Sequence, residues 1–193
     1  MPIMLDPKRT AFIAMDFQND ILGMTPNYLE ANLLGNVKNV LDLGRRKGAP
    51  IIYITVSFRD DYADAPAQCP LFQGVKAGGV LKAGSPGAAI CDELKPQSGD
   101  IVVNKHCVDP FNGTHLHNIL RGRGVDTLLL MGVWTNYVVE ATARTGADSG
   151  YRIIVVTDGC ASNSEENHQF FISKILPTVG TAAFTGEVIA ALD

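Results

Sequence analysis

The feature that most constrains the fold is an apolar run that ends in glycine and passes into helix-forming residues. Residues 128–131 read Leu-Leu-Leu-Met, Gly132 and Val133 follow, and residues 134–144 lead through Thr-Asn into helix formers. This pattern predicts a buried parallel strand that feeds directly into a helix. Ligands bind at the carboxyl ends of such strands, where the N–H groups that open the helix favour developing negative charge. The sequence therefore predicts a functional site at this turn.

Other apolar runs alternate with segments of helical periodicity along the chain. Besides the run that opens at Leu128, strands are predicted over 10–16, 50–57, 100–105, 152–157 and 182–184. Helical spacing predicts helices over 29–47, around 116–120, from 138 towards 150 and over 168–176, with a last helix at the end. This alternation predicts an α/β fold: a doubly wound, three-layer α/β/α domain over residues 1–193 with a mostly parallel six-stranded sheet.

The segment over about 58–98 interrupts that alternation. Proline, glycine and alanine are scattered through it with little periodicity, apart from a helical turn predicted over 88–94. A connection this long inside a compact domain is typical of a lid or binding loop, which is the role predicted here. Arg59, Lys76 and Lys82 within it offer contacts to an anionic substrate, although solvent-exposed positions are commoner for such residues.

Composition limits the classes of function. The chain has 193 residues, 46% of them hydrophobic, and a formal net charge of −4, which predicts one soluble domain without an electrostatic footprint for nucleic acid or membrane. No apolar run approaches the roughly 20 residues that span a bilayer, and no signal peptide is apparent, so a cytoplasmic protein is expected. The four cysteines lie far apart and are expected to be isolated, reduced thiols.

Three separated motifs together resemble the isochorismatase-like hydrolase superfamily, which includes nicotinamidases, N-carbamoylsarcosine amidohydrolases and isochorismatases. Residues 14–20 match its first-strand motif, residues 103–105 with 111–116 match its lysine strand and the segment after it, and residues 132–144 match its nucleophile turn. Most members carry cysteine six residues after the glycine of that turn, where this chain has Val138. The resemblance covers nearly the whole length. It implies a cis peptide bond between Val133 and Trp134 and assembly into a homo-oligomer, a dimer or a tetramer.

The resemblance also implies roles for individual residues. Asp16 matches the general acid/base, Lys105 matches the lysine that lies near both acid and nucleophile, and Val138 stands where the nucleophile would be. Trp134 and Tyr137 flank the turn and can stack on a planar substrate, complete the core or form a subunit contact. Contacts to a small-molecule substrate are predicted for Gln18, Arg59, Phe111, Trp134 and Tyr137.

The sequence gives less support to a metal site, to a catalytic thiol at Cys107 or to a catalytic His168 than to Asp16 and Lys105. Nicotinamidase-type relatives bind a metal through an Asp and two His near the long connection, but all four histidines here follow residue 105, so neither a metal nor another cofactor is expected. Cys107 lies two residues beyond Lys105, out of place for the family nucleophile, and is predicted to be a packed thiol. His168 falls on the apolar face of its helix and is predicted to be a hydrogen-bonded structural residue.

Three functional hypotheses remain open because valine has no lone pair with which to attack a carbonyl. Isochorismatases, which also lack the cysteine, cleave a vinyl ether by acid/base chemistry, and the favoured hypothesis is a non-covalent hydrolysis of this type centred on Asp16 and Lys105. The first alternative is an amidohydrolase acting on a C–N bond whose cysteine has been replaced, naturally or by engineering, by Val138, since Thr135 and Asn136 resemble the amidase branch. The second is a catalytically inactive binding protein on the same scaffold, against which the retention of Asp16 and Lys105 counts.

Overall fold

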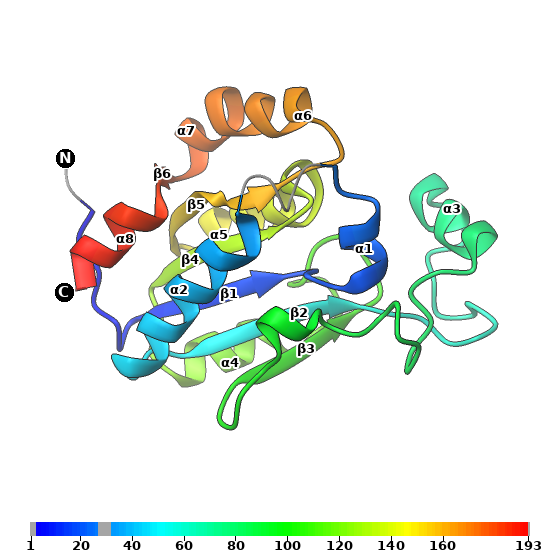
Figure 1. Ribbon diagram of the computed structural model, residues 1–193, viewed down its shortest axis with the longest axis horizontal. Coiled ribbons are helices and arrows are strands. Elements are labelled where there is room, and N and C mark those ends of the chain that lie inside the picture. Colours follow the sequence, from blue (N-terminus) through cyan, green and yellow to red (C-terminus); the bar gives the residue numbers. More distant parts are fainter. Residues whose placement is uncertain (1–2, 27–31, 193) are drawn as a thin grey trace.

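A six-stranded parallel sheet forms the centre of the protein. The structure is a computed structural model that describes residues 3–26 and 32–192. The strand order is β3-β2-β1-β4-β5-β6, and all neighbouring strands in it run parallel (Figure 1), which confirms the predicted α/β architecture. The strands are β1 Thr10–Met15, β2 Ile51–Val56, β3 Ile101–Lys105, β4 Thr127–Val133, β5 Arg152–Ala161 and β6 Thr181–Ala183.

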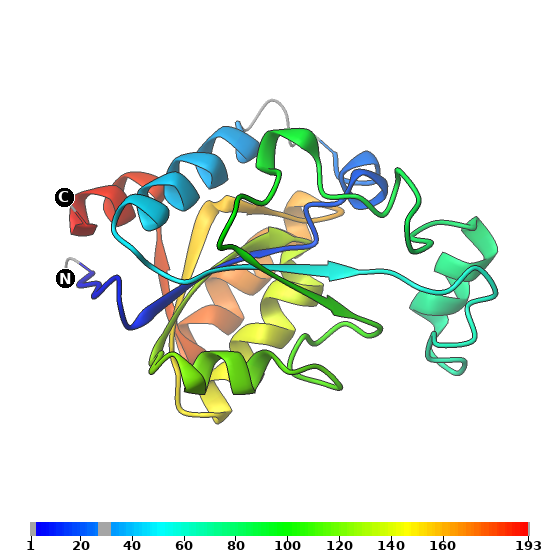
Figure 2. The same cartoon turned by 90° about the horizontal axis from the view of Figure 1, so that it is seen from below.

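Helices cover both faces of the sheet (Figures 1 and 2). One face packs against α2 (Leu33–Arg46) and α8 (Thr185–Leu192), and the other packs against α4 (Leu116–Gly122), α5 (Glu140–Asp148) and α7 (Leu176–Val179). The remaining helical segments of these layers are α6 (Glu165–Phe170) and two π-helical turns, Thr135–Val139 and Phe171–Ile175. The helix predicted over 29–47 corresponds to α2, and its predicted start at Leu29 lies outside the described residues.

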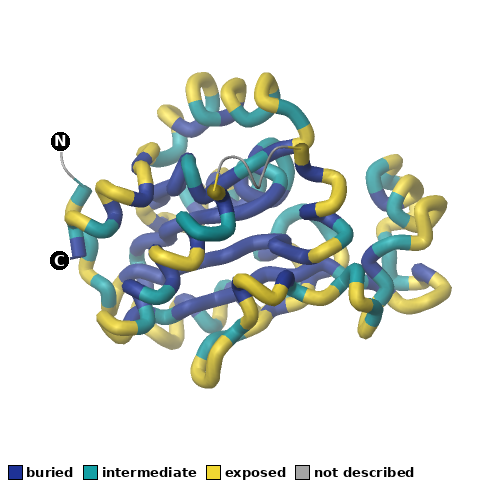
Figure 3. The backbone as a smooth tube through the Cα atoms, viewed as in Figure 1, coloured by how far each residue is buried: buried dark blue, intermediate teal, exposed yellow. Residues whose placement is uncertain are grey.

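Burial on both faces explains why the central strands read as continuous apolar runs. All residues of β1, β2 and β4 are buried, as Figure 3 shows in dark blue. Along β1, Ile13 and Met15 face the α4 and α5 side, whereas Phe12 and Ala14 face the α2 and α8 side. This alternation builds two cores from one strand.

The predicted strand limits agree with the structure to within one residue except at β5, which continues to Ala161. The pairing of β5 with β4 shifts register between Leu130 and Gly132, and the shifted part pairs Gly132 with Cys160. The apolar run of β5 is interrupted at residues 157–159, so the sequence pattern did not mark the last part of the strand.

The region over 58–98 contains a nine-residue helix, α3 (Pro70–Gly78), which the prediction of an aperiodic connection missed. Residues typical of helix ends mark both limits of α3. Pro70 stands at the first helical position, and Gly79 follows the helix with φ of 64°. The helical turn predicted over 88–94 is a single 3₁₀ turn, Asp92–Leu94. α3 stands away from the sheet, beyond the carboxyl ends of the central strands (Figure 1).

Among the described residues, no helix combines the length and the apolar character needed to cross a membrane.

Candidate active site

Asp16 and Lys105 meet at the carboxyl edge of the sheet. Asp16 follows β1 directly and its N–H donates to the carbonyl oxygen of Ile54 on β2 at 2.9 Å, while Lys105 ends β3, where it pairs with Val56. Because the three strands are parallel neighbours, their carboxyl ends lie at one edge. There the Nζ of Lys105 donates to Oδ2 of Asp16 at 2.9 Å.

The backbone and the burial of Asp16 set its chemistry. Its φ is 60°, a left-handed conformation that costs a non-glycine residue about 1–3 kcal/mol and is concentrated at functional sites. The residue is 5% exposed, and burial raises the pKa of its carboxyl, whereas the neighbouring Lys105 opposes that rise without cancelling it. Among the described residues, Oδ1 has no hydrogen-bond partner. The carboxyl therefore keeps its proton to a higher pH than an ordinary aspartate and has one oxygen free.

The turn after β4 brings Val138 to the same edge. A side chain at Gly132 would place Cβ 3.0 Å from both Cβ and the carbonyl oxygen of Met15, so the close approach of β1 and β4 favours glycine here. The peptide bond between Val133 and Trp134 is cis, as the sequence resemblance implied. Thr142 Oγ1 donates to the carbonyl oxygen of Val138 at 2.6 Å and secures the turn.

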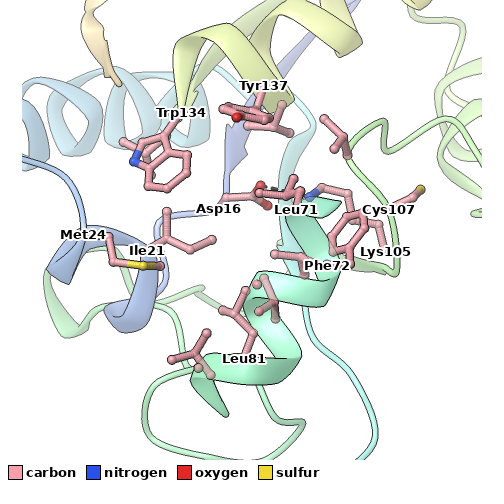
Figure 4. A pocket seen from close by; sticks show the side chains of 18 residues that line it. Asp16, Ile21, Met24, Leu71, Phe72, Leu81, Lys105, Cys107, Trp134 and Tyr137 are labelled. Carbon is pink, nitrogen blue, oxygen red and sulfur yellow. Dashed lines mark hydrogen bonds and ion pairs between the residues drawn. The ribbon is translucent and has the colours of Figure 1, made fainter. Parts of the chain in front are cut away.

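A cavity of about 310 Å³ joins these residues at the point where the winding of the sheet reverses, between β1 and β4. Asp16, Lys105 and Val138 all line it, and so do Trp134 and Tyr137, whose ring centroids lie 5.6 Å apart (Figure 4). Trp134 Nε1 donates to Thr25 Oγ1 at 2.8 Å, so its polar atom is already engaged. The structure thus brings together five of the eight residues that the sequence predicts for the site.

Much of the remaining lining was missed by sequence reasoning. It consists of apolar side chains from α1 (Asn19–Gly23) and the residue after it, from α3, and from the segment that follows α3, namely Ile21, Met24, Leu71, Phe72, Val75, Val80 and Leu81. The spacing of Leu71, Phe72 and Val75 behind Pro70 is helical, and this was the signal that could have identified α3.

Gln18, one of the predicted substrate contacts, does not line the cavity. Its Nε2 donates to the carbonyl oxygens of Val56 at 2.8 Å and Ala88 at 2.7 Å, and its Oε1 accepts from the N–H of Val56 at 2.8 Å. The side chain is fully buried and its amide is engaged in joining β2 to the region over 58–98.

We expect Gln18→Ala to lower the free energy of unfolding by about 1–3 kcal/mol, because the buried backbone groups of Val56 and Ala88 lose their partner. Urea denaturation followed by circular dichroism measures the change. Gln169→Ala is the control. Within the described part of the chain that exposed amide bonds only Glu165 on its own helix, and its loss should cost at most about 0.5 kcal/mol. Equal effects of the two substitutions would contradict this assignment.

Phe111 and Arg59, two further predicted substrate contacts, also lie outside the cavity lining. Phe111 packs against Tyr151 and His117, with ring centroids 6.1 and 6.2 Å away, on the α4 and α5 side of the sheet. Arg59 is exposed and its Nε donates to Asp61 at 3.2 Å. Aromatic packing accounts for the position of Phe111, and solvation of its charge accounts for the position of Arg59.

Cys107 lines the cavity with its thiol engaged by backbone groups, and His168 is hydrogen-bonded outside the cavity. The thiol of Cys107 donates to the carbonyl oxygens of Asp109 at 3.2 Å and Asn112 at 3.3 Å, and its sulfur points away from Asp16 (Figure 4). Burial raises the pKa of this thiol, which disfavours the reactive thiolate. His168 Nδ1 lies 2.8 Å from Thr135 Oγ1, and burial lowers the pKa of its imidazole. The predicted hydrogen-bonded, structural histidine is confirmed.

Comparisons with known proteins agree with this architecture. The family profile of the isochorismatase domain matches residues 10–187. The isochorismatase family protein YwoC of Bacillus subtilis (strain 168) is 32% identical over 185 residues, which cover 96% of this chain and 95% of YwoC. Ureidoacrylate amidohydrolase RutB of Caulobacter segnis is 31% identical over 166 residues, covering 75% of this chain and 69% of RutB. A cysteine hydrolase from Pseudomonas syringae pv. phaseolicola 1448A superposes with a TM-score of 0.89 and 27% identity, covering 100% and 95% of the two chains.

Proposed function

The chain belongs to the isochorismatase family and is a hydrolase, and from this premise we propose that it hydrolyses a small molecule by acid/base catalysis without a covalent intermediate. The observation that carries the proposal is the carboxyl of Asp16, which is buried, has a raised pKa and keeps Oδ1 free at the cavity. A carboxyl with these properties stays protonated to higher pH than an ordinary aspartate and suits proton donation. At Val138 the turn offers only a hydrocarbon side chain, so no attack on the substrate starts there.

Cleavage of a vinyl ether is the reaction that this site fits best. Asp16 gives its proton to the terminal carbon of the double bond, and the positive charge spreads to the ether oxygen. Water then adds to the carbon that bears this oxygen and returns a proton to Asp16. The resulting hemiketal moves its hydroxyl proton to the leaving oxygen and breaks its C–O bond, which releases a ketone and an alcohol. Each step uses only water and one carboxyl that donates and recovers a proton.

Lys105 tunes the proton donor in this scheme. Its Nζ holds Oδ2 of Asp16 at 2.9 Å, which orients the carboxyl, and among the described residues Oδ1 has no hydrogen-bond partner. The same cation limits the rise of the Asp16 pKa, so that the carboxyl can lose its proton and recover it within one turnover. The region over 58–98, through α3, forms the outer wall and is proposed to act as the lid that excludes bulk water.

The pH dependence of kcat/KM follows from the protonated carboxyl. The donor is present below the raised pKa of Asp16 and is lost as pH rises through it, so activity should fall on the alkaline side of that pKa, above the ordinary aspartate value of about 3.9. Lys105→Met removes the charge that opposes the rise, so the falling limb should move to higher pH. Arg59→Ala, at an exposed residue outside the cavity, is the control and should leave the limb in place. If Lys105→Met left the pH at which kcat/KM falls unchanged, Lys105 would not be controlling the pKa of Asp16.

Hydrolysis of a C–N bond is the second candidate, because RutB is an amidohydrolase whose similarity covers 75% of this chain. In this case water would have to attack the amide carbon directly, with Asp16 taking its proton and passing it to the leaving nitrogen. The apolar Val138 makes this route slower than attack by a thiolate.

A turnover screen tests the proposal. A thermal-shift screen of uncharged alkyl and aryl vinyl ethers, isochorismate, small amides and ureides would identify binders, and each binder would then be assayed for product release. We expect vinyl-ether turnover and no covalent adduct in the intact mass of the enzyme during turnover. A substrate-dependent adduct would contradict the non-covalent route. Binding without turnover of any compound would instead support the inactive scaffold.

A further inference from the structure

The wall of the cavity that faces Asp16 is apolar. Ile21 and Met24 form one side of it, and α3 contributes Leu71 and Phe72 to the other (Figure 4). Val75 of α3 also lines the cavity. The volume of about 310 Å³ lies at the lower end of the range of small-molecule sites, roughly 300–1,000 Å³. A ligand that fills this space places most of its surface against hydrocarbon.

Charge is confined to one end of the cavity. Among the described residues that line it, Lys105 is the one basic side chain and Asp16 the one acidic side chain, and the two are hydrogen-bonded to each other. Lys82 lies instead over the ring of Tyr62, 5.8 Å from its centroid. A substrate carboxylate placed far from Asp16 would therefore be desolvated without a counter-ion, which is strongly unfavourable.

The exposure of the apolar wall points the same way. Leu71 and Val75 are half-buried and Met24 is 46% exposed, although all three face the cavity. An apolar ligand group would cover these side chains, and the flexible thioether of Met24 can adapt to its shape.

We propose that the substrate carries an uncharged aryl or alkyl group that packs between Met24 and α3, with its polar, scissile end confined to Asp16 and Lys105. This inference rests on the proposed hydrolysis at Asp16 and adds to it the class of substrate. A molecule charged at both ends is excluded by the same geometry.

Trp134 makes binding directly measurable, because it is the single tryptophan of the chain and it lines the cavity. Titrating propanamide, butanamide, pentanamide and hexanamide while following tryptophan fluorescence yields a dissociation constant for each. Burial of each added methylene is expected to lower Kd by about four-fold, which corresponds to about 0.8 kcal/mol. Glutaramate, which has the length of pentanamide and a carboxylate at the far end, is expected to bind at least about ten-fold more weakly. A Kd that does not change with chain length, or glutaramate binding as tightly as pentanamide, would overturn the inference.

Two variants of α3 test whether the alkyl group of the amide packs against this helix. Val75→Asp puts a carboxylate into the wall and should abolish the dependence of Kd on chain length, whereas Ala77→Asp adds the same charge at an exposed position of the same helix and should preserve it. Equal behaviour of the two folded variants would place the alkyl group elsewhere and overturn the inference. If Val75→Asp does not fold, the Kd values of the amide series and of glutaramate with wild type still test whether the cavity binds an uncharged alkyl group.

Failure of this inference can be separated from failure of the proposed function. Chain-length-dependent binding in the absence of any hydrolysis would refute the proposed reaction while supporting the class of ligand. Hydrolysis whose kcat/KM does not rise with the size of an alkyl substituent on the substrate would support the proposed reaction and refute the class of ligand.

Discussion

Replacing Asp16 with Asn is expected to lower kcat/KM by about 10²–10⁴-fold, the usual contribution of a positioned general acid/base. The amide keeps the shape of the side chain, and its oxygen can still accept the hydrogen bond from Lys105, but it cannot donate a proton and recover it. Steady-state kinetics with the substrate found by the turnover screen measures the loss. The fall should appear in kcat as well as in kcat/KM, because the interaction is made in the transition state.

Folding must be separated from chemistry in this experiment, because Asp16→Asn leaves Lys105 buried without its counter-ion, and such changes are destabilising. Urea denaturation of the variant determines whether it is folded under assay conditions, and binding of hexanamide, followed through Trp134, shows whether its cavity is intact. A folded variant that binds the amide and turns substrate over at the wild-type rate would move the chemistry away from Asp16.

The sheet and the charged pair were predictable because their sequence signals are local. Each strand is a short apolar run, and parallel strands have their carboxyl ends at one edge, so residues that end a run must gather there. Asp16 and Lys105 both stand directly at the end of a run, and Val138 lies one turn beyond another. The parallel topology brings these strand ends to one edge, whereas the choice of these three residues came from the resemblance of their motifs to the family.

The walls of the cavity were not predictable by the same reasoning. Gln18 lies two residues from Asp16 within a matching motif, yet its amide binds backbone groups of Val56 and Ala88, which are far away in the sequence. Phe111 also belongs to a matching motif, but it turns to the opposite core, where Tyr151 packs against it. A motif records which residues recur together, whereas the direction of each side chain depends on tertiary contacts that no local pattern contains.

Val138→Cys is expected to introduce an alkylatable thiol into the site. The position lines the cavity beside Lys105, at the start of a helical segment, and both a nearby cation and a helix N-terminus favour the thiolate. Iodoacetamide should therefore modify residue 138 of the variant, as peptide mass mapping would show, whereas wild type has no thiol there. Slow hydrolysis of small amides is expected to accompany the modification-sensitive thiol, because attack by cysteine makes the C–N reaction accessible to a site that already holds Asp16 and Lys105.

The native cysteines provide internal controls for this experiment. Burial raises the pKa of Cys91 to about 11 and that of Cys160 to about 12, so both should react far more slowly than a thiol at position 138. Cys107 has a pKa raised by burial and a sulfur that is turned towards backbone carbonyl oxygens, so Cys107→Ser should retain most of the native hydrolysis. If alkylation of Cys107 in the wild type abolished hydrolysis and Cys107→Ser did so too, a displaced thiol would be carrying out the attack and the non-covalent mechanism would be wrong. If the Val138→Cys thiol stayed unmodified in a folded variant, the cavity would not be activating a nucleophile at that position, and descent of this site from a cysteine amidase would lose its support.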